Sequence, residues 1–235
     1  MVAYLNRPDV QGRPLDAGEL ALLGSMIRRS DNQAANRVSA IVGTTGLNRL
    51  ARAAKMRAFT PYPVWGGSQI TAADQAWFFE RIDDRVTRRH SVYAMRLLRS
   101  IVPDQRWGIA RVRPAGWTLH FKGGWFPGAN AVDHQVALLT RGHRRVSLAI
   151  LISGSPSSAY ANETLRGVAL RLLRGINAQP KAKAGPARSR TRPRVTASSG
   201  SSTAAATSGP FSWTTLLGDG WLKPRGLVEW APLSV

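Results

Sequence analysis

The sequence predicts an α+β fold in which helices pack on an antiparallel sheet. Three observations predict it. Apolar residues recur at helical spacing up to about residue 100, residues 117–153 change to a period of two, and helical spacing returns at 162–173. Helices, then a run of strands, then a closing helix are typical of helices segregated against one antiparallel sheet.

The first helix is predicted to begin at Asp16, whose side chain can cap free amide groups while Glu19 reaches back. It ends near Arg29, a cation suited to a helix C-terminus. Its apolar residues follow one helical face: Leu20, Leu23 and Ile27. A second helix is predicted over 33–42 with Gly43 as its stop, and a third begins near Thr45.

Residues 59–69, FTPYPVWGGSQ, are rich in Pro and Gly and predict a loop. The next helix is predicted to open at Thr71, with Asp74 completing the same capping pattern. It would carry Trp77, Phe78 and Ile82. A further helix is predicted from Ser91, with these residues facing inward: Val92, Met95 and Leu98.

Three strands are predicted. Trp117, Leu119 and Phe121 alternate with polar residues in the first strand, and residues 132–140 form the second. Residues 146–153 are apolar on both faces, which predicts a central position for the third strand. Gly142, His143 and Arg144 mark the turn of an antiparallel hairpin. The last helix is predicted over 162–173, with these residues inward: Leu165, Val168, Ala169 and Leu172.

Composition divides the chain into two parts. We expect one folded domain over residues 1–176 and a basic, low-complexity tail over 177–235 that is too poor in apolar residues to fold. The tail ends with Trp213, Trp221 and Trp230 in no clear pattern.

The 235-residue chain has no cysteine, which excludes disulfides and thiolate metal sites. Its formal net charge of +20 favours anionic partners without choosing among them. No apolar run is long enough to span a bilayer, and no signal peptide follows Met1.

Two short motifs carry the functional signal. Ser30-Asp31-Asn32 follows the first predicted helix, and Lys122-Gly123-Gly124 ends the first strand motif. S-x-x-K, S-D-N and K-T-G mark the penicillin-recognising serine enzymes. Residues 2–175 therefore resemble the penicillin-binding serine hydrolases, close to the class A β-lactamases, and the expected fold is β-lactamase/transpeptidase-like and incomplete at its N-terminus.

The resemblance implies roles for six residues. Ser30 would relay a proton to the leaving nitrogen, and Lys122 would attract the substrate carboxylate and hold the Ser30 hydroxyl. Asn32 would bind the amide side chain of the substrate, and Asp31 would tie down its loop. Gly123 and Gly124 would let the substrate lie against the strand. Taken singly, the same residues are also ordinary helix-capping groups, a strand-end cation and a bulge.

The sequence departs from the family pattern in three ways. It contains no Ser-x-x-Lys, so the acylated nucleophile and its lysine are missing. Gly123 replaces the hydroxyl residue of K-T-G, and the 59–69 loop lacks the acid that deacylates class A enzymes. We expect Met1 to be an internal start, with S-x-x-K and an export signal upstream, as such proteins are usually exported.

Four histidines add no further site. His90, His120, His134 and His143 show no metal-ligand spacing, so neither a metal nor a cofactor is expected. His120 shares a strand face with Lys122, and we expect it at the surface.

The first hypothesis is accordingly a serine hydrolase that acts on a β-lactam or a related peptide or ester. The implied role is β-lactam breakdown and antibiotic resistance. This chain is expected to be inactive. The second is a non-catalytic relative that binds cell wall or anionic polymers, and the third is nucleic-acid binding through cations at 181–194, although specific recognition is not indicated there. We expect a monomer with a small-molecule partner.

Overall fold

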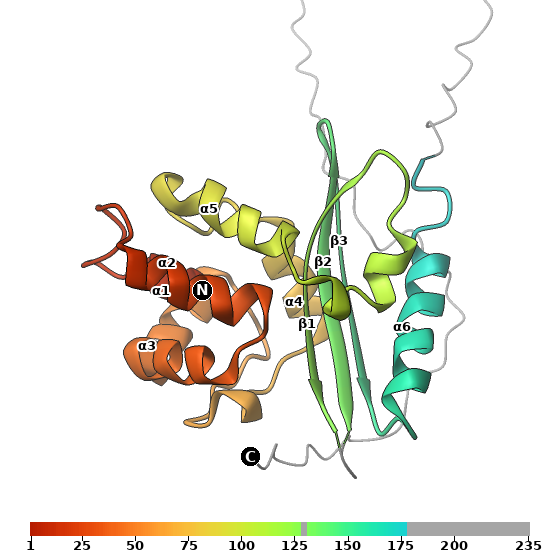
Figure 1. Cartoon of the computed structure of the whole chain (residues 1–235), viewed down its shortest axis with the longest axis horizontal. Helices are drawn as coiled ribbons and strands as arrows, with labels where there is room; N and C mark the ends of the chain where they lie inside the picture. The colour runs from red at the N-terminus through yellow and green to blue at the C-terminus, as the bar shows by residue number, and fades with distance from the viewer. Residues whose placement is uncertain (128–130, 178–235) are drawn as a thin grey trace, which may run out of the picture. The chain divides into compact units, whose positions relative to one another are not determined.

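The computed structural model describes residues 1–127 and 131–177. The predicted tail lies outside the described residues from position 178 onward, so its disorder and the domain boundary at 176/177 remain predictions. Within the described part, an antiparallel sheet separates helices α1, α2, α3 and α5 from helix α6 (Figure 1). The predicted α+β class is confirmed.

The elements follow the predicted order of helices, strands and a closing helix. The α-helices are α1 (Val2–Leu5), α2 (Ala17–Arg28), α3 (Asn32–Ala53), α4 (Ala72–Glu80), α5 (Arg88–Arg99) and α6 (Ser158–Leu172). Short 3-10 turns are η1 (Trp65–Gly67), η2 (Pro103–Gln105) and η3 (Gly108–Val112). The strands are β1 (Thr118–Phe126), β2 (Val132–Arg141) and β3 (Arg144–Ser153).

The predicted capping box at the start of α2 is confirmed. Glu19 N donates to Asp16 Oδ1 at 2.8 Å, and Asp16 N donates to Glu19 Oε2 at 2.9 Å. The buried Glu19 carboxylate also accepts hydrogen bonds from Arg13 Nη1 at 2.7 Å and from Tyr4 Oη at 2.9 Å. The bond from Arg13 is the main reason that the pKa of Glu19 falls to about 2. One carboxylate thus ties α1 and the loop after it to α2.

The predicted stop at Gly43 is also confirmed, because it divides α3 into two helical segments. Gly43 has φ 63° and ψ 172°, a region that only glycine adopts readily. The helical path resumes near Thr45, as predicted.

Only half of the capping pattern predicted at the start of α4 is formed. Thr71 Oγ1 accepts from Asp74 N at 3.2 Å. The Asp74 carboxylate does not accept from the Thr71 backbone N, as the second half would require; it accepts instead from Arg57 N at 3.0 Å and Ala58 N at 2.8 Å. The helix ends at Glu80, so the predicted inclusion of Ile82 is wrong.

The strands form a meander in the order β1-β2-β3, both pairs antiparallel. The predicted hairpin is confirmed, with Arg141 opposite Arg144 and Gly142 at φ 56°. The predicted central place of the third strand is wrong, since β2 is central and β3 is at one edge of the described sheet. Strand β3 is apolar on both faces because α4 covers one face and α6 the other.

Two apolar clusters lie on opposite faces of the sheet. Leu138 of β2 packs with helices α2 and α5, while Phe121 and Leu139 pack with α6. Two residues that were predicted to face the core do not: Val92 is 79% exposed and Leu172 is 62% exposed. Helix α5 begins at Arg88 and buries His90, Ala94, Leu97 and Leu98; the end of α6 buries Leu173.

Candidate functional site

Ser30 and Lys122, which are 92 positions apart in the chain, are in direct contact. Lys122 Nζ donates a hydrogen bond to Ser30 Oγ at 2.6 Å. A second bond runs from Nζ to the carbonyl oxygen of Gly123. Lys122 lies opposite Val136 in the register of β1 and β2, on the face of the sheet that packs against α2 and α5.

The tight junction between α2 and α3 positions Ser30. Its φ of 56° reverses the chain between Arg29, the C-cap of α2, and Asp31, the N-cap of α3. Asp31 Oδ1 accepts from Ala34 N at 3.1 Å and Oδ2 accepts from Ser25 Oγ at 2.7 Å. These bonds, the one from Ser25 first, hold the pKa of Asp31 below its usual value.

A residue that the sequence analysis missed completes the contact. Ser30 Oγ donates to Gln105 Oε1 at 2.8 Å, and Gln105 Nε2 donates to the carbonyl oxygen of Arg29 at 2.8 Å. Gln105 closes the short turn η2, and a single glutamine in such a turn has no motif by which the sequence could identify it.

The Lys122 ammonium is half-buried, and burial lowers its pKa to about 8. Within residues 1–127 and 131–177, each carboxylate in an ion pair has an arginine as its partner, and Lys122 has no ion pair. A cation that is partly desolvated and has no anion beside it can bind an incoming anionic group strongly.

The other three predicted binding residues differ in their surroundings. Asn32 is the first residue of α3 and is exposed. Gly124 is exposed, and a Cβ atom built there would meet no atom within 4 Å. Gly123 is buried and faces away from Ser30, because its Cβ would lie 3.6 Å from Trp107 Cζ2.

The Beta-lactamase2 family model, described as the β-lactamase enzyme family, matches residues 16–176. This match covers more than half of the chain. The chain belongs to the β-lactamase enzyme family. A comparison with curated protein sequences gives no match.

Solved β-lactamase structures share the fold. A point mutant of the class A β-lactamase of the last common ancestor of Gram-negative bacteria has a TM-score of 0.62 and 16% identity, over 76% of this chain and 81% of that one. The chromosome-encoded β-lactamase of Vibrio parahaemolyticus has a TM-score of 0.59 and 15% identity, over 68% of this chain. The β-lactamase of Desulfarculus baarsii has a TM-score of 0.56 and 22% identity, also over 68%. The chain spans only 65% of the Vibrio enzyme and 64% of the Desulfarculus enzyme.

Within this family member, the expectation of a surface His120 is wrong. His120 is 7% exposed, because α5 packs against β1, and burial lowers its pKa to about 4. It lines a cavity of about 500 Å³ together with Asp83, Met95 and Thr140, and neither Ser30 nor Lys122 lines this cavity. No cluster of side chains that could hold a metal ion occurs among the described residues.

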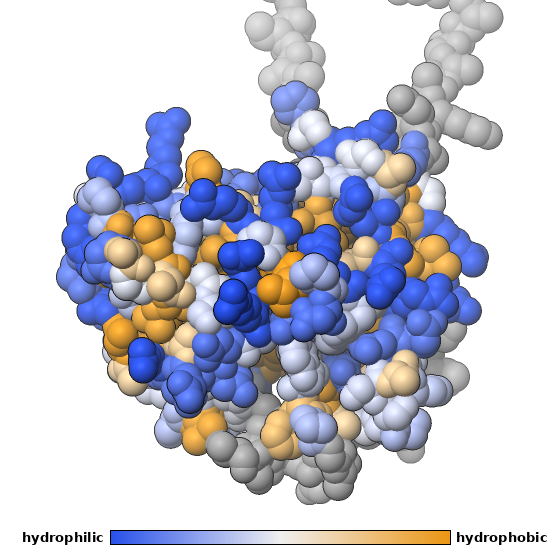
Figure 2. Space-filling view, viewed as in Figure 1, coloured by the Kyte–Doolittle hydropathy of each residue, from blue (hydrophilic) through white to orange (hydrophobic). Residues whose placement is uncertain are grey.

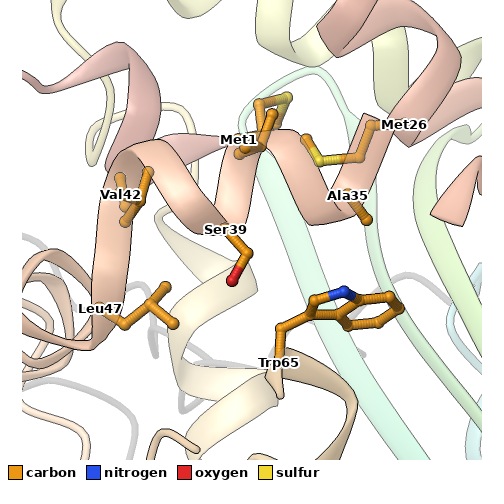
Figure 3. Close-up of a pocket in the computed structure, with 9 residues that line it drawn as sticks. Met1, Met26, Ala35, Ser39, Val42, Leu47 and Trp65 are labelled. Atoms are coloured by element: carbon orange, nitrogen blue, oxygen red, sulfur yellow. The ribbon is translucent and has the colours of Figure 1, made fainter. Parts of the chain in front are cut away.

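A second cavity, of about 150 Å³, lies beside α2 and α3 and is apolar. Figure 3 shows Trp65 below α3, with Met26, Ala35 and Leu47 around the same space. Neither Ser30 nor Lys122 lines this cavity. In the described part of the chain, no helix has the length and apolar character needed to cross a membrane.

Proposed function

We propose that this β-lactamase family chain recognises a small anionic substrate, a β-lactam or a related peptide or ester, through Ser30 and Lys122. One observation carries the proposal: the hydrogen bond of 2.6 Å between Lys122 Nζ and Ser30 Oγ, made by an ammonium without an ion pair. The family assignment makes serine hydrolase chemistry the relevant class.

Lys122 supplies the charge for substrate capture. With a pKa of about 8 it is about nine-tenths protonated at pH 7. A substrate carboxylate would accept a charge-assisted hydrogen bond from Nζ, which is stronger than a neutral one. The hydrogen bond from the ammonium also holds the Ser30 hydroxyl in place.

Asn32 and Gly124 would border the bound substrate. Asn32 stands in the first turn of α3, next to the Ser30 junction, and offers an exposed amide that can both donate and accept. Gly124 leaves open space beside the strand, two residues after Lys122. Gly123 faces Trp107, so its proposed contribution is through its backbone alone.

Covalent turnover needs groups that this sequence does not contain. It has no Ser-x-x-Lys, and the 59–69 loop has no acid. Formation of an acyl-enzyme requires an activated nucleophile and a base to take its proton. We therefore propose that this chain binds the substrate without acylation.

Two measurements test the proposal. Incubation with a fluorescent penicillin, followed by a denaturing gel, is expected to give no labelled band, and a labelled band would refute binding without acylation. Ligand-observed NMR with benzylpenicillin is expected to detect binding that Lys122→Met abolishes. Lys55→Met removes the same charge from an exposed lysine just after α3 and is the matched control. Equal binding by both variants would refute the site.

The net charge of +20 supports a second candidate function, the binding of an anionic wall polymer. Polar side chains predominate on the face shown in Figure 2. A polyanion held by this charge would bind equally well to wild type and Lys122→Met and would dissociate with added salt. Saturable polymer binding that Lys122→Met removes would instead assign the polymer to the Ser30–Lys122 site. Nucleic-acid binding through residues 181–194 concerns residues outside the described part.

A further inference from the structure

We propose that Trp125 and Trp107 form an aromatic subsite beside Lys122, and that it selects carboxylate ligands bearing an aryl group. The inference rests on the proposed function and names the substrate class of the same site. Neither tryptophan was assigned a role from the sequence.

Trp125 is placed to touch a ligand held by Lys122. It follows Lys122 by three residues on β1, and 44% of its surface is exposed. Lys122 Nζ lies 5.9 Å from the centroid of the Trp125 ring. A carboxylate bonded to this ammonium therefore brings the adjoining part of the ligand within reach of the indole.

Trp107, in the turn before η3, packs against Trp125. The two ring centroids are 6.0 Å apart with an interplanar angle of 74°, an edge-to-face arrangement. The Trp107 ring lies against β1 at Gly123, where a Cβ would be in ordinary van der Waals contact with Trp107 Cζ2 at 3.6 Å. The Trp125 ring therefore has both the Lys122 ammonium and the Trp107 ring within 6.0 Å of its centroid.

The backbone under Trp107 is fixed by a buried side chain. Gln135 of β2 donates from Nε2 to the Trp107 carbonyl oxygen at 3.0 Å and accepts at Oε1 from Ile109 N at 2.7 Å. Gly108, between them, has φ 57°, and a Cβ there would be 2.4 Å from Gln135 Oε1. The subsite is therefore formed before a ligand arrives, so binding requires little reordering of this wall.

The indole and the ammonium together indicate the class of ligand. An indole face attracts a second aromatic ring or another flat apolar group, whereas a small alkyl group gains only the burial of its own area. An aromatic contact of this kind is expected to change affinity by about two- to twelvefold. The combination of an ammonium and an indole within 5.9 Å of each other thus suits an anion with an aryl substituent.

The test compares two small carboxylates that carry the same charge. One is phenylacetate, whose ring lies next to the carboxylate, and the other is propionate. Titrations by ligand-observed NMR are expected to show that wild type prefers phenylacetate by about two- to twelvefold. Trp125→Ala is expected to reduce this preference to about onefold, while Trp125→Phe should keep it. An unchanged preference in folded Trp125→Ala, or no preference in wild type, would overturn the subsite.

A further arm separates this inference from the proposed function. Lys122→Met should weaken the binding of both carboxylates, whereas Trp125→Ala should weaken phenylacetate more than propionate. If benzylpenicillin does not bind wild type, the proposed function fails, and neutral phenylacetamide then tests the subsite alone. Binding of phenylacetamide to wild type but not to Trp125→Ala would support it, and binding to neither would overturn it as well.

Discussion

Replacing Lys122 by methionine is expected to stabilise the fold while it removes ligand binding. The ammonium is partly buried without an ion pair, and burial lowers its pKa to about 8. A lysine whose charge is disfavoured in the folded state reduces the free energy of unfolding wherever that charge is present. Methionine has a similar length and no charge, so it removes this penalty and little volume.

The size of the effect follows from the two pKa values. The difference between 10.5 in the unfolded chain and about 8 in the fold corresponds to about 3 kcal/mol at pH 7. The hydrogen bonds from Nζ to Ser30 and Gly123 offset part of it, and solvent around the half-buried side chain screens the rest. We therefore expect a gain of about 1–2 kcal/mol at pH 7.

The gain in stability of Lys122→Met should decrease as pH rises. Below pH 8, Lys122 is charged in both folded and unfolded wild type, so the full difference appears. As pH rises from about 8 toward 10.5, folded wild type loses its proton first, and its disadvantage disappears.

Urea unfolding of wild type, Lys122→Met and Lys55→Met at about pH 7 and about pH 10 measures this effect. The control should change little, because Lys55 is exposed. A less stable Lys122→Met at the lower pH, or a gain that is equal at both pH values, would refute the reasoning.

Two further substitutions test how the site is supported. Glu19→Gln should lower the free energy of unfolding at pH 7 by about 3 kcal/mol because the pKa of Glu19 is about 2 beside Arg13. This contribution is present above pH 4.5 and is lost as pH falls toward 2, so acid unfolding curves of variant and wild type should converge, and a constant gap would contradict the carboxylate's role. Gly108→Ala should cost at least about 2 kcal/mol through its positive φ and the clash with Gln135. Gly12→Ala, where a Cβ meets no atom within 4 Å, should change little; equal urea midpoints for the two alanine variants would contradict the packing described around η3.

Features with local signals were predictable from the sequence. The capping box of Asp16 and Glu19, the break at Gly43 and the hairpin turn at Gly142 depend on residues within a few positions of one another. Short-range geometry decides such features, so the pattern of residue types is sufficient.

Features that depend on tertiary packing were not predictable from the sequence. Val92 was expected inward because it shares an apolar face with Met95, but the sheet contacts the other side of α5 and leaves Val92 79% exposed. Strand β3 was expected to be central because it is apolar on both faces, and only the placement of α4 and α6 explains that pattern at a sheet edge.

The candidate site shows the same division. Ser30 and Lys122 stand in motifs, and their predicted neighbourhood agrees with the hydrogen bond between them. Gln105 and Gln135 act through side-chain amides that reach across the fold, one to Ser30 and one to the turn under Trp107. Such contacts have no fixed spacing in the sequence, so no residue pattern could predict them.

The bond between Ser30 and Gln105 determines where the only hydroxyl proton at this position points. Gln105 Nε2 is occupied by the Arg29 carbonyl, so its Oε1 faces Ser30 and takes that proton, while Nζ of Lys122 occupies a lone pair of Oγ. In this arrangement Ser30 has nothing to donate to a newcomer. Any ligand atom that is to receive the Ser30 proton must first displace the glutamine amide as the acceptor, so this side chain competes directly with the substrate.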